Sequence, residues 1–321
     1  MPIAQGSADE HVARWTRILN ESRVPYRKNW PGFLFRHEEV GNASRIIRSG
    51  QLLARSEAVN YTDVAAADII CTTNRAHSFA RLYFRPMSPT QFRIEGIRRP
   101  AEVWHGAHAP VLVMFAFDAA SVLAAQGTNF SDGNMQSPDS SQGDDELFFS
   151  GIDFRDVYHV GSFTQEHRER IVRSRCAEVL AASPLTLAGK LRAIICRSPA
   201  ERTYLLDLIG AEAALSWGRL IVSHTEPGIF ENKWAYVETV DVSSLGMRIK
   251  FHPRQDGDVC DIAVRILNGA DQVWHGMKAG ASMSVVWNVN TELAPGSYRC
   301  EIKVDGSLAY SAVHLIDELP F

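Results

Sequence analysis

The stretch RLYFRPMSPTQF, residues 81–92, decides the fold of the first part of this chain. It begins as a strand, because the tripeptide LYF is apolar and two of its residues are aromatic. Pro86 and Pro89 then end the strand, since each lacks a backbone donor. Arginines flank the interrupted strand, and a guanidinium fork matches a phosphate. We therefore expect a strand that ends in a rigid turn beside an anionic ligand; the alternative is a buried edge strand with solvated arginines.

Length and composition limit the classes of protein that this chain can represent. A chain of 321 residues exceeds the usual single-domain size, so two domains are expected. The net charge is −4, whereas a non-specific nucleic-acid coat protein is basic overall, so any nucleic-acid site must be a local basic patch. Five scattered cysteines without a CxxC pair argue against zinc and against a disulfide framework. We expect no metal, no signal peptide, no membrane span and a cytoplasmic location.

The first two thirds of the chain mix short strands and helices without a regular alternation. Residues 7–20 have a helical apolar stripe, with Ser7 as the expected N-cap. Asn42 is the expected N-cap of a helix over residues 43–49, and Gly50 ends that helix. This irregular order favours an α+β fold over a doubly wound α/β fold. Other expected elements are strands at 33–35, 110–117 and 176–180, and a helix that begins at Ser198 and Pro199.

The character of the sequence changes after residues 226–228. Short alternating strands follow, separated by turn signals, which predicts an antiparallel, Ig-like β-sandwich. We therefore divide the chain into residues 1–228 and 229–321. The second part offers no catalytic cluster, so we expect residues 1–228 to retain the chemistry on their own. The expected strands are 237–242, 247–251, 262–267, 282–289 and 298–304.

Four segments, in this order, resemble the DarT family of DNA ADP-ribosyltransferase toxins. They are FRHEEVGNASRIIRSGQLLAR (35–55), residues 81–92, NFSDGN (129–134) and RSRCAEVL (173–180). The resemblance covers roughly residues 30–210. It implies an ADP-ribosyltransferase-like split mixed sheet with helices, NAD+ as substrate and transfer of ADP-ribose to a base of single-stranded DNA. It also implies a bacterial toxin or anti-phage effector with a macrodomain (DarG-like) antitoxin as partner.

The resemblance implies that Glu178 is the catalytic residue. A fixed carboxylate stabilises the oxocarbenium-like ribose carbon that forms when the nicotinamide bond of NAD+ breaks. It can also accept a proton from the attacking base nitrogen. Without the resemblance, an outward-facing glutamate on a half-buried strand is the ordinary interpretation.

The same resemblance implies a set of residues that contact NAD+. Arg36 or His37 fills the family's position at the end of the first strand, and Asn42 fixes the loop beside it. Residues 69–75 lack the family's usual double arginine, which indicates a branch diverged from the best-known thymidine-modifying members. The expected NAD+ contacts are Arg36, His37, Asn42, Arg55, Arg75, Arg81 and Tyr83.

Arginines beside aromatic residues provide candidate DNA contacts. Bases stack on aromatic rings while arginines follow the phosphates, although a solvated charged face is the alternative. Transfer to RNA or protein, and a non-enzymatic nucleotide-binding module, also remain open, as does the choice between guanosine and thymidine. One arginine group lies near Phe92, Trp104 and His105, and the other includes Arg168 and Arg170. The expected DNA contacts are Arg85, Arg93, Arg173 and Arg175.

Overall fold

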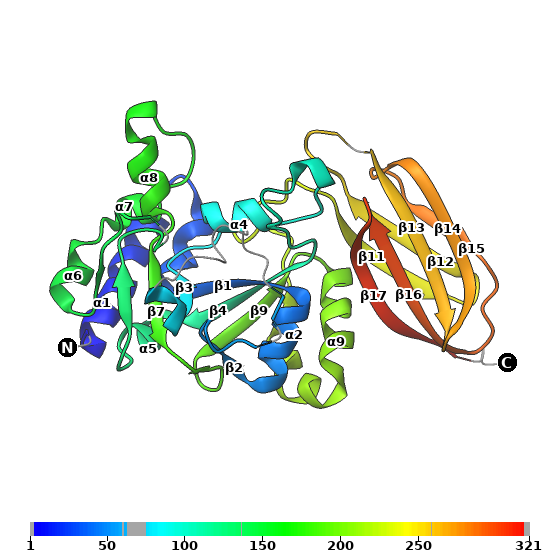
Figure 1. Ribbon diagram of the computed structural model, residues 1–321, viewed down its shortest axis with the longest axis horizontal. Helices are drawn as coiled ribbons and strands as arrows, with labels where there is room; N and C mark the ends of the chain where they lie inside the picture. Colours follow the sequence, from blue (N-terminus) through cyan, green and yellow to red (C-terminus); the bar gives the residue numbers. More distant parts are fainter. Residues whose placement is uncertain (1–2, 60, 63–74, 136, 258, 318–321) are drawn as a thin grey trace.

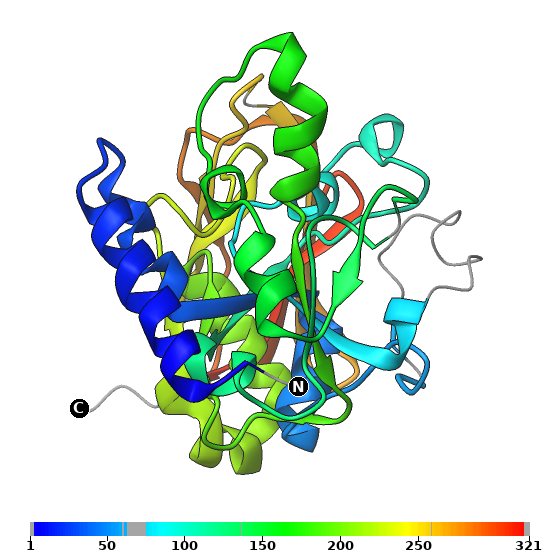
Figure 2. The same ribbon diagram turned by 90° about the vertical axis from the view of Figure 1, so that its left-hand side faces the viewer.

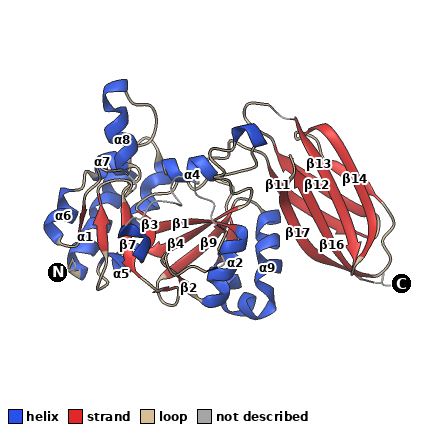
Figure 3. Cartoon of the chain, in the orientation of Figure 1, coloured by secondary structure: helices blue, strands red, loops and turns tan. Residues whose placement is uncertain are grey.

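The computed structural model describes residues 3–317 except 60, 63–74, 136 and 258. A mixed sheet with helices is followed by an all-β region at the C-terminal end (Figures 1 and 3). The α+β class and the C-terminal antiparallel sheets predicted from the sequence are confirmed.

The first region is built on an eight-stranded sheet of order β10-β9-β4-β1-β3-β7-β5-β6. Strands β9 and β10 pair in parallel and the other described pairs of this sheet are antiparallel, so the sheet is mixed. Its strands are β1 (Phe33–Glu39), β3 (Phe79–Tyr83), β4 (Leu112–Asp118), β5 (Asn129–Ser131), β6 (Gln142–Gly143), β7 (Glu178–Ala182), β9 (Leu191–Cys196) and β10 (Ile221–Ser223), and a separate pair joins β2 (Gln51–Leu52) to β8 (Leu185–Thr186).

Helices cover this sheet, with α1 running along one side of the region (Figure 2). The α-helices are α1 (Gln5–Asn20), α2 (Val40–Ser49), α4 (Pro89–Ile94), α5 (Ala119–Leu123), α6 (Glu146–Gly151), α7 (Phe154–Val157), α8 (Arg168–Ser174) and α9 (Pro199–Trp217). Short 3-10 helices are η1 (Pro25–Gly32), η2 (Arg75–Ser78), η3 (Pro100–Glu102), η4 (Gln165–His167) and η5 (Gly218–Leu220).

Two predicted helix caps are wrong. The Glu39 carboxylate caps α2 by accepting from the backbone of Gly41 at 2.8 Å and of Asn42 at 3.2 Å, which puts Asn42 inside the helix. Helix α1 starts at Gln5, and the Ser7 hydroxyl instead donates to Glu146 at 2.6 Å. Glu39 caps α2 in place of Asn42 because its carboxylate accepts from two backbone amides that have no partner within the helix. The stop at Gly50 is confirmed, with a left-handed φ of 68°.

The C-terminal region pairs a three-stranded sheet, β11-β12-β15, with a four-stranded sheet, β14-β13-β16-β17. The Tyr298 hydroxyl donates to the Ala294 carbonyl at 2.9 Å and ties the turn to its strand. Two strands, β14 and β17, were not predicted. The bounds are β11 (Tyr236–Ser243), β12 (Gly246–His252), β13 (Val259–Asn268), β14 (Asp271–Ser282), β15 (Trp287–Asn290), β16 (Gly296–Val304) and β17 (Ser307–Ile316).

The segment that follows residue 228 is bonded into the first region. The buried Glu95 carboxylate accepts from the backbone of Glu231 at 2.9 Å and of Asn232 at 3.2 Å. The Ser198 hydroxyl, which begins α9, donates to the Val237 carbonyl at 2.6 Å. Five hydrophobic side chains of the segment are buried, namely those of Phe230, Trp234, Ala235, Tyr236 and Val237. A division at residue 228 therefore separates the eight-stranded sheet from the two C-terminal sheets, but it cuts through the packed contacts that join the two regions.

These contacts change what we expect of a truncation after residue 228. The shortened chain leaves Oε1 of the buried Glu95 carboxylate without its two backbone amide donors and exposes the apolar surface that Trp234 covers. We predict that residues 1–228 unfold without the cooperativity of the complete chain. Urea unfolding followed by near-ultraviolet circular dichroism checks this. Cooperative unfolding together with retained transfer activity would restore the separable first domain expected from the sequence.

The reverse face of the strands β3, β7 and β5 rests on an aromatic cluster. Phe84 and Phe130 of this face, with Phe149 and Phe154 from α6 and α7, lie close to one another, with ring centroids 4.9 Å apart for Phe130 and Phe149 and 5.1 Å for Phe84 and Phe154. His11 of α1 inserts edge-on, 4.3 Å from the ring of Phe154. Burial, with a smaller effect of the nearby Arg14 charge, lowers the pKa of His11 to about 3.

We predict that His11 makes the fold acid-sensitive. The unfolded chain protonates this histidine below about pH 6.5 while the folded chain keeps it neutral, so stability falls as the pH drops below that value. At pH 5 the loss is about 2 kcal/mol. His11→Phe should reduce the decline in unfolding free energy between pH 7 and pH 5. Equal declines in the variant and the wild type would contradict this.

Candidate active site

Three neighbouring strands present the candidate residues on one face of the sheet. Tyr83 on β3 is the register partner of Phe35 on one side and of Glu178 on the other. Alternation along β1 places His37 on the face of Phe35, and alternation along β3 places Arg81 on the face of Tyr83. The sheet therefore assembles four of the predicted residues from β1, β3 and β7.

The sheet divides between β1 and β3. Within the described residues, these two strands pair at one position, Phe35 with Tyr83, while β1 stays paired with β4 over seven positions from Phe33 to Glu39. Beyond Phe35, β1 is thus free to part from β3. The side chains of Arg36 and His37 lie where the two strands diverge, beside Arg81. This is the split that the sequence resemblance implied.

Arg81 and Glu178 form a two-bond ion pair. The Nε atom of Arg81 donates to Oε2 of Glu178 at 2.8 Å, and its Nη2 atom donates to Oε1. The Glu178 side chain is fully buried and that of Arg81 is 13% exposed. Burial lowers the pKa of Arg81, but the charge of Glu178, the nearby Tyr83 and the hydrogen bond to Glu178 together outweigh that effect, and the net shift is upward. Arg81 therefore stays charged, and its two bonds give the Glu178 side chain one fixed orientation.

His37 and Tyr83 stack on each other above this pair, with ring centroids 5.2 Å apart and planes within 9°. Burial, reinforced by the charges of Arg36 and Arg81, lowers the pKa of His37 to about 3. Burial and the nearby Glu178 charge raise the pKa of Tyr83. Near neutral pH the imidazole and the phenol are therefore both uncharged and act as hydrogen-bonding and stacking groups.

Arg36 is held at the edge of the site by two contacts. Its Nε atom donates to Glu38 at 2.7 Å, and its Nη1 atom lies 3.4 Å from the Arg81 carbonyl. Its side chain is 27% exposed, twice the fraction of Arg81. Of these two arginines, Arg36 is thus the more accessible to an anionic group.

Asn42 and Ser131 support the site from behind. The Asn42 side-chain amide donates to the Thr62 carbonyl at 2.7 Å, and its oxygen accepts from the Thr62 backbone nitrogen at 2.9 Å. These two bonds fix the backbone at Thr62. The Ser131 hydroxyl accepts from the Glu178 backbone at 3.0 Å and donates to the Gly133 carbonyl at 2.7 Å. Ser131 lies in the segment 129–134 that resembles the family, but its bond to the Glu178 backbone joins residues 47 positions apart and has no signal in the sequence.

The two other predicted NAD+ contacts, Arg55 and Arg75, belong to the segments after β2 and at the start of η2. Arg55 follows β2 in a turn whose next residue, Ser56, bonds the His77 carbonyl at 2.9 Å. Arg75 begins η2, but its side chain, like residues 69–74 before it, lies outside the described part of the chain.

The four predicted DNA contacts differ in how much their guanidinium groups are buried and bonded to other groups of the protein. Arg85 is 3% exposed and donates to the backbone of Pro86 and Val157 at 3.0 and 3.2 Å, so it fixes loops instead of facing solvent. Arg173 donates to the Asp139 carbonyl at 3.2 Å. Arg175 lies 2.6 Å from the His159 imidazole. Arg93 is exposed, so it remains the most accessible of the four.

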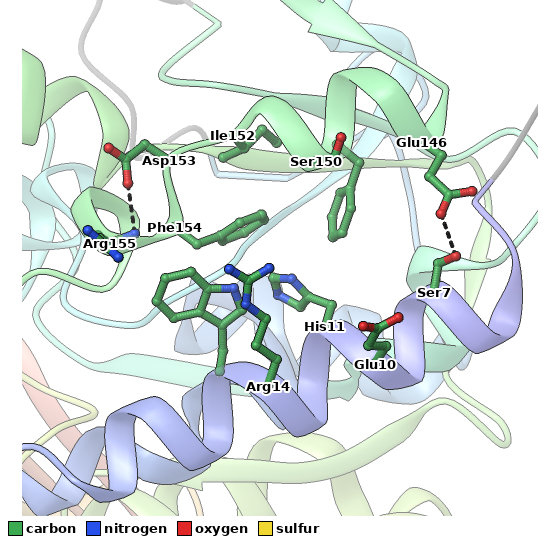
Figure 4. Close-up of a pocket in the computed structure, with 12 residues that line it drawn as sticks. Ser7, Glu10, His11, Arg14, Glu146, Ser150, Ile152, Asp153, Phe154 and Arg155 are labelled. Carbon is green, nitrogen blue, oxygen red and sulfur yellow. Dashed lines mark hydrogen bonds between the residues drawn. The ribbon is translucent and has the colours of Figure 1, made fainter.

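A cavity of about 330 Å³ lies on the other side of these strands, between α1 and the α6–α7 segment (Figure 4). His11, Phe149 and Phe154 line it, and Glu146 and Arg14 lie at its rim. Because side chains alternate along a strand, this cavity faces the aromatic cluster and not Glu178. The catalytic candidate is thus enclosed by its own partners.

Within the described residues, no group of three metal-ligating side chains gathers. Among the helices that the structure describes, none has the length and apolar character needed to span a bilayer.

We predict that Arg81 and Glu178 are strongly coupled in stability. Arg81→Met leaves a buried carboxylate without its cation, which costs roughly 3–5 kcal/mol. Adding Glu178→Gln removes the charge and should recover most of that loss, a result that urea unfolding measures. Arg265→Met in the exposed Arg265–Glu301 pair is the matched control and should cost less than about 1 kcal/mol. Additive effects of the two site substitutions would rule out the coupling.

Comparison with known proteins identifies the family. The family model for the ssDNA thymidine ADP-ribosyltransferase DarT matches residues 35–224. No curated protein sequence matches the chain.

Solved structures of similar fold include two of Thermus sp. 2.9 DarT. The complex with ADP-ribosylated ssDNA shares 16% identity at a TM-score of 0.48, over 61% of this chain and 95% of the other. The complex with NAD+ shares 14% identity at a TM-score of 0.45, over 61% and 96%. Thermosipho africanus DarTG in complex with ADP-ribose shares 17% identity at a TM-score of 0.43, over 56% and 48%. Since the family model matches more than half of its residues, this chain belongs to the DarT family.

Proposed function

We propose that this protein transfers ADP-ribose from NAD+ to a base of single-stranded DNA. The observation that carries the proposal is the group of Glu178, Arg81, Tyr83 and His37 on one face of the divided sheet. In the reaction, the bond between nicotinamide and the ribose C1′ breaks, and its electron pair leaves with nicotinamide. A base nitrogen forms the new bond to C1′ and loses its proton.

Glu178 is the residue that touches the reacting atoms in this proposal. Its fixed carboxylate stabilises the positive ribose carbon, and it accepts the proton that the base nitrogen releases. Ser131 and Arg81 are positioning residues, because they hold the backbone and the side chain of Glu178. A carboxylate held from both sides does not need to reorganise when charge develops, which is how preorganised sites gain rate.

The other residues fit a dinucleotide with two phosphates. Arg36 is the more exposed cation at the divergence of β1 and β3 and suits the pyrophosphate. The uncharged His37 and Tyr83 rings offer a stacking surface without adding positive charge next to the positive nicotinamide. Asn42 fixes the chain at Thr62, which borders this edge.

The biological setting is part of the same proposal. A DNA-modifying enzyme of this family suits a bacterial toxin or anti-phage effector controlled by a macrodomain antitoxin, and the Thermosipho africanus relative carries the DarTG name. The accepted base, thymidine or guanosine, is proposed to be selected by the residues around Glu178.

We predict that Glu178→Gln keeps the fold and lowers transfer by about 10²–10³-fold or more, because it removes the charge that faces the ribose carbon. The matched control is Glu212→Gln on an exposed part of α9, which should transfer normally. Labelled NAD+ with a single-stranded oligonucleotide provides the measurement. The variant should also be tolerated by a host without an antitoxin. Wild-type rates in folded Glu178→Gln protein would exclude Glu178 from the chemistry.

Single-stranded DNA should be the preferred acceptor, and added salt should weaken its binding. Extruding a paired base costs a few kcal/mol, so duplex DNA should react slowly. Arginines that contact phosphates make binding fall with salt concentration. Parallel assays with single-stranded DNA, duplex DNA, RNA and a protein mixture check both statements. Faster labelling of RNA or protein would replace the acceptor in our proposal and leave the NAD+ chemistry in place.

A further inference from the structure

A group of rings and cations lies on the surface that follows α4. Trp104 is 37% exposed and Phe92 is 38% exposed. The guanidinium of Arg93 lies 4.5 Å from the centre of the Trp104 ring, and the His105 ring meets that indole edge-on at 4.6 Å. We call Phe92, Arg93, Trp104 and His105, together with Lys233, the Trp104 surface.

Lys233 brings the segment after residue 228 into this surface. Its ammonium lies 4.9 Å from the centre of the Phe92 ring. Phe92 also meets Trp234 edge-on at 5.3 Å, and Arg98 covers Trp234 at 3.8 Å. Lys233 and Trp234 follow the end of the family match at residue 224. The Trp104 surface therefore combines residues inside the family match with residues beyond it.

The C-terminal sandwich holds the loop that carries Trp104. Arg254, with a side chain 1% exposed, donates two bonds to the Glu102 carboxylate at 2.8 and 2.9 Å. The same carboxylate accepts from the Arg99 backbone at 2.9 Å. A β-bridge joins Ile97 to Ala235. Figure 1 shows the segment after α4 reaching toward the sandwich. Arg254 thus pairs with Glu102, the acid nearest this loop tip in sequence, and also with Asp256 at 2.9 Å.

Helix α4 connects this surface to the candidate active site. It begins at Pro89, six residues after Tyr83, the last residue of β3 and the register partner of Glu178. The helix has six residues and is therefore about 9 Å long. The helix that carries Arg93, which covers Trp104, thus begins close in the chain to the strand that carries Tyr83.

We propose that the Trp104 surface is a stacking platform for single-stranded DNA next to the reacting base, and that the sandwich braces it. Rings accept bases of any sequence, while Arg93, Arg99 and Lys233 meet the phosphates. The proposal rests on the proposed function for its ligand. It gives the sandwich a role in capturing the acceptor, with no part in the chemistry.

Binding is tested without turnover in the complete Glu178→Gln chain, with a fluorescent single-stranded oligonucleotide and anisotropy. Trp104→Ala should raise the Kd by about 5- to 150-fold, the range for loss of one stacked base. Trp104→Phe should recover most of the affinity. Lys233→Gln should lower the salt dependence of binding by about one phosphate contact. Trp274→Ala, the same substitution on the distant strand β14, is the control and should bind as the parent does.

The brace is tested in the same assay with Arg254→Met, which frees Glu102 and the loop. Its Kd should rise, although by less than that of Trp104→Ala, and Arg265→Met elsewhere in the sandwich should leave the Kd unchanged. Urea unfolding of each variant separates a loss of binding from a loss of fold. Wild-type affinity in folded Arg254→Met would overturn the brace.

The outcomes distinguish this inference from the proposed function. If the wild type modifies the oligonucleotide and folded Trp104→Ala binds it with unchanged Kd, the platform is overturned and the proposed function stands. If the wild type transfers nothing to DNA while Trp104→Ala still loses binding, the platform stands and the proposed function fails. If Trp104→Ala loses the same affinity for RNA as for DNA, the rings stack bases without selecting the sugar, which supports the platform. If it loses affinity for RNA alone, DNA is overturned as the ligand.

Discussion

The ion pair between Arg81 and Glu178 is the constraint on which the rest of the site depends. A fully buried carboxylate is tolerated only with a cation and hydrogen bonds around it. Arg81 supplies the cation from the next strand, and the β3–β7 register brings the two side chains to the same face. A shift of that register by one residue would turn Arg81 and Tyr83 to the reverse face and leave Glu178 buried alone. The chemistry is therefore tied to strand pairing.

The two faces of the central strands have different tasks. Glu178 and Tyr83 face the candidate site, while the alternate residues Val179 and Phe84 face the aromatic cluster that includes His11. Rigid packing on the reverse face fixes the strands, and fixed strands fix the carboxylate. Helix α1 lies before the start of the family match, yet it completes this packing.

Sequence patterns predicted the parts of this fold that depend on local composition. The apolar tripeptide 82–84 and the prolines after it predicted β3 and its end, and Gly50 predicted the end of α2. Partners distant in sequence could not be read in the same way. Arg85 looked like its exposed neighbours, but the fold buries it against backbone carbonyls. Strand β14 was missed because most of its side chains are exposed and its glycines weaken the alternating pattern.

The interlocked junction after residue 228 has a consequence for the order of synthesis. The loop that carries Trp104 gains its bonds to Arg254 only after that residue has been synthesised. The Glu95 carboxylate likewise gains its backbone donors only with residues 231–232. Ribosomes add roughly 5–20 residues per second, so the last 90 or so residues take several seconds to appear. During that time the nascent first region has β7, the strand that carries Glu178, but lacks the support of the junction. A chain released early by a premature stop would lack that support permanently.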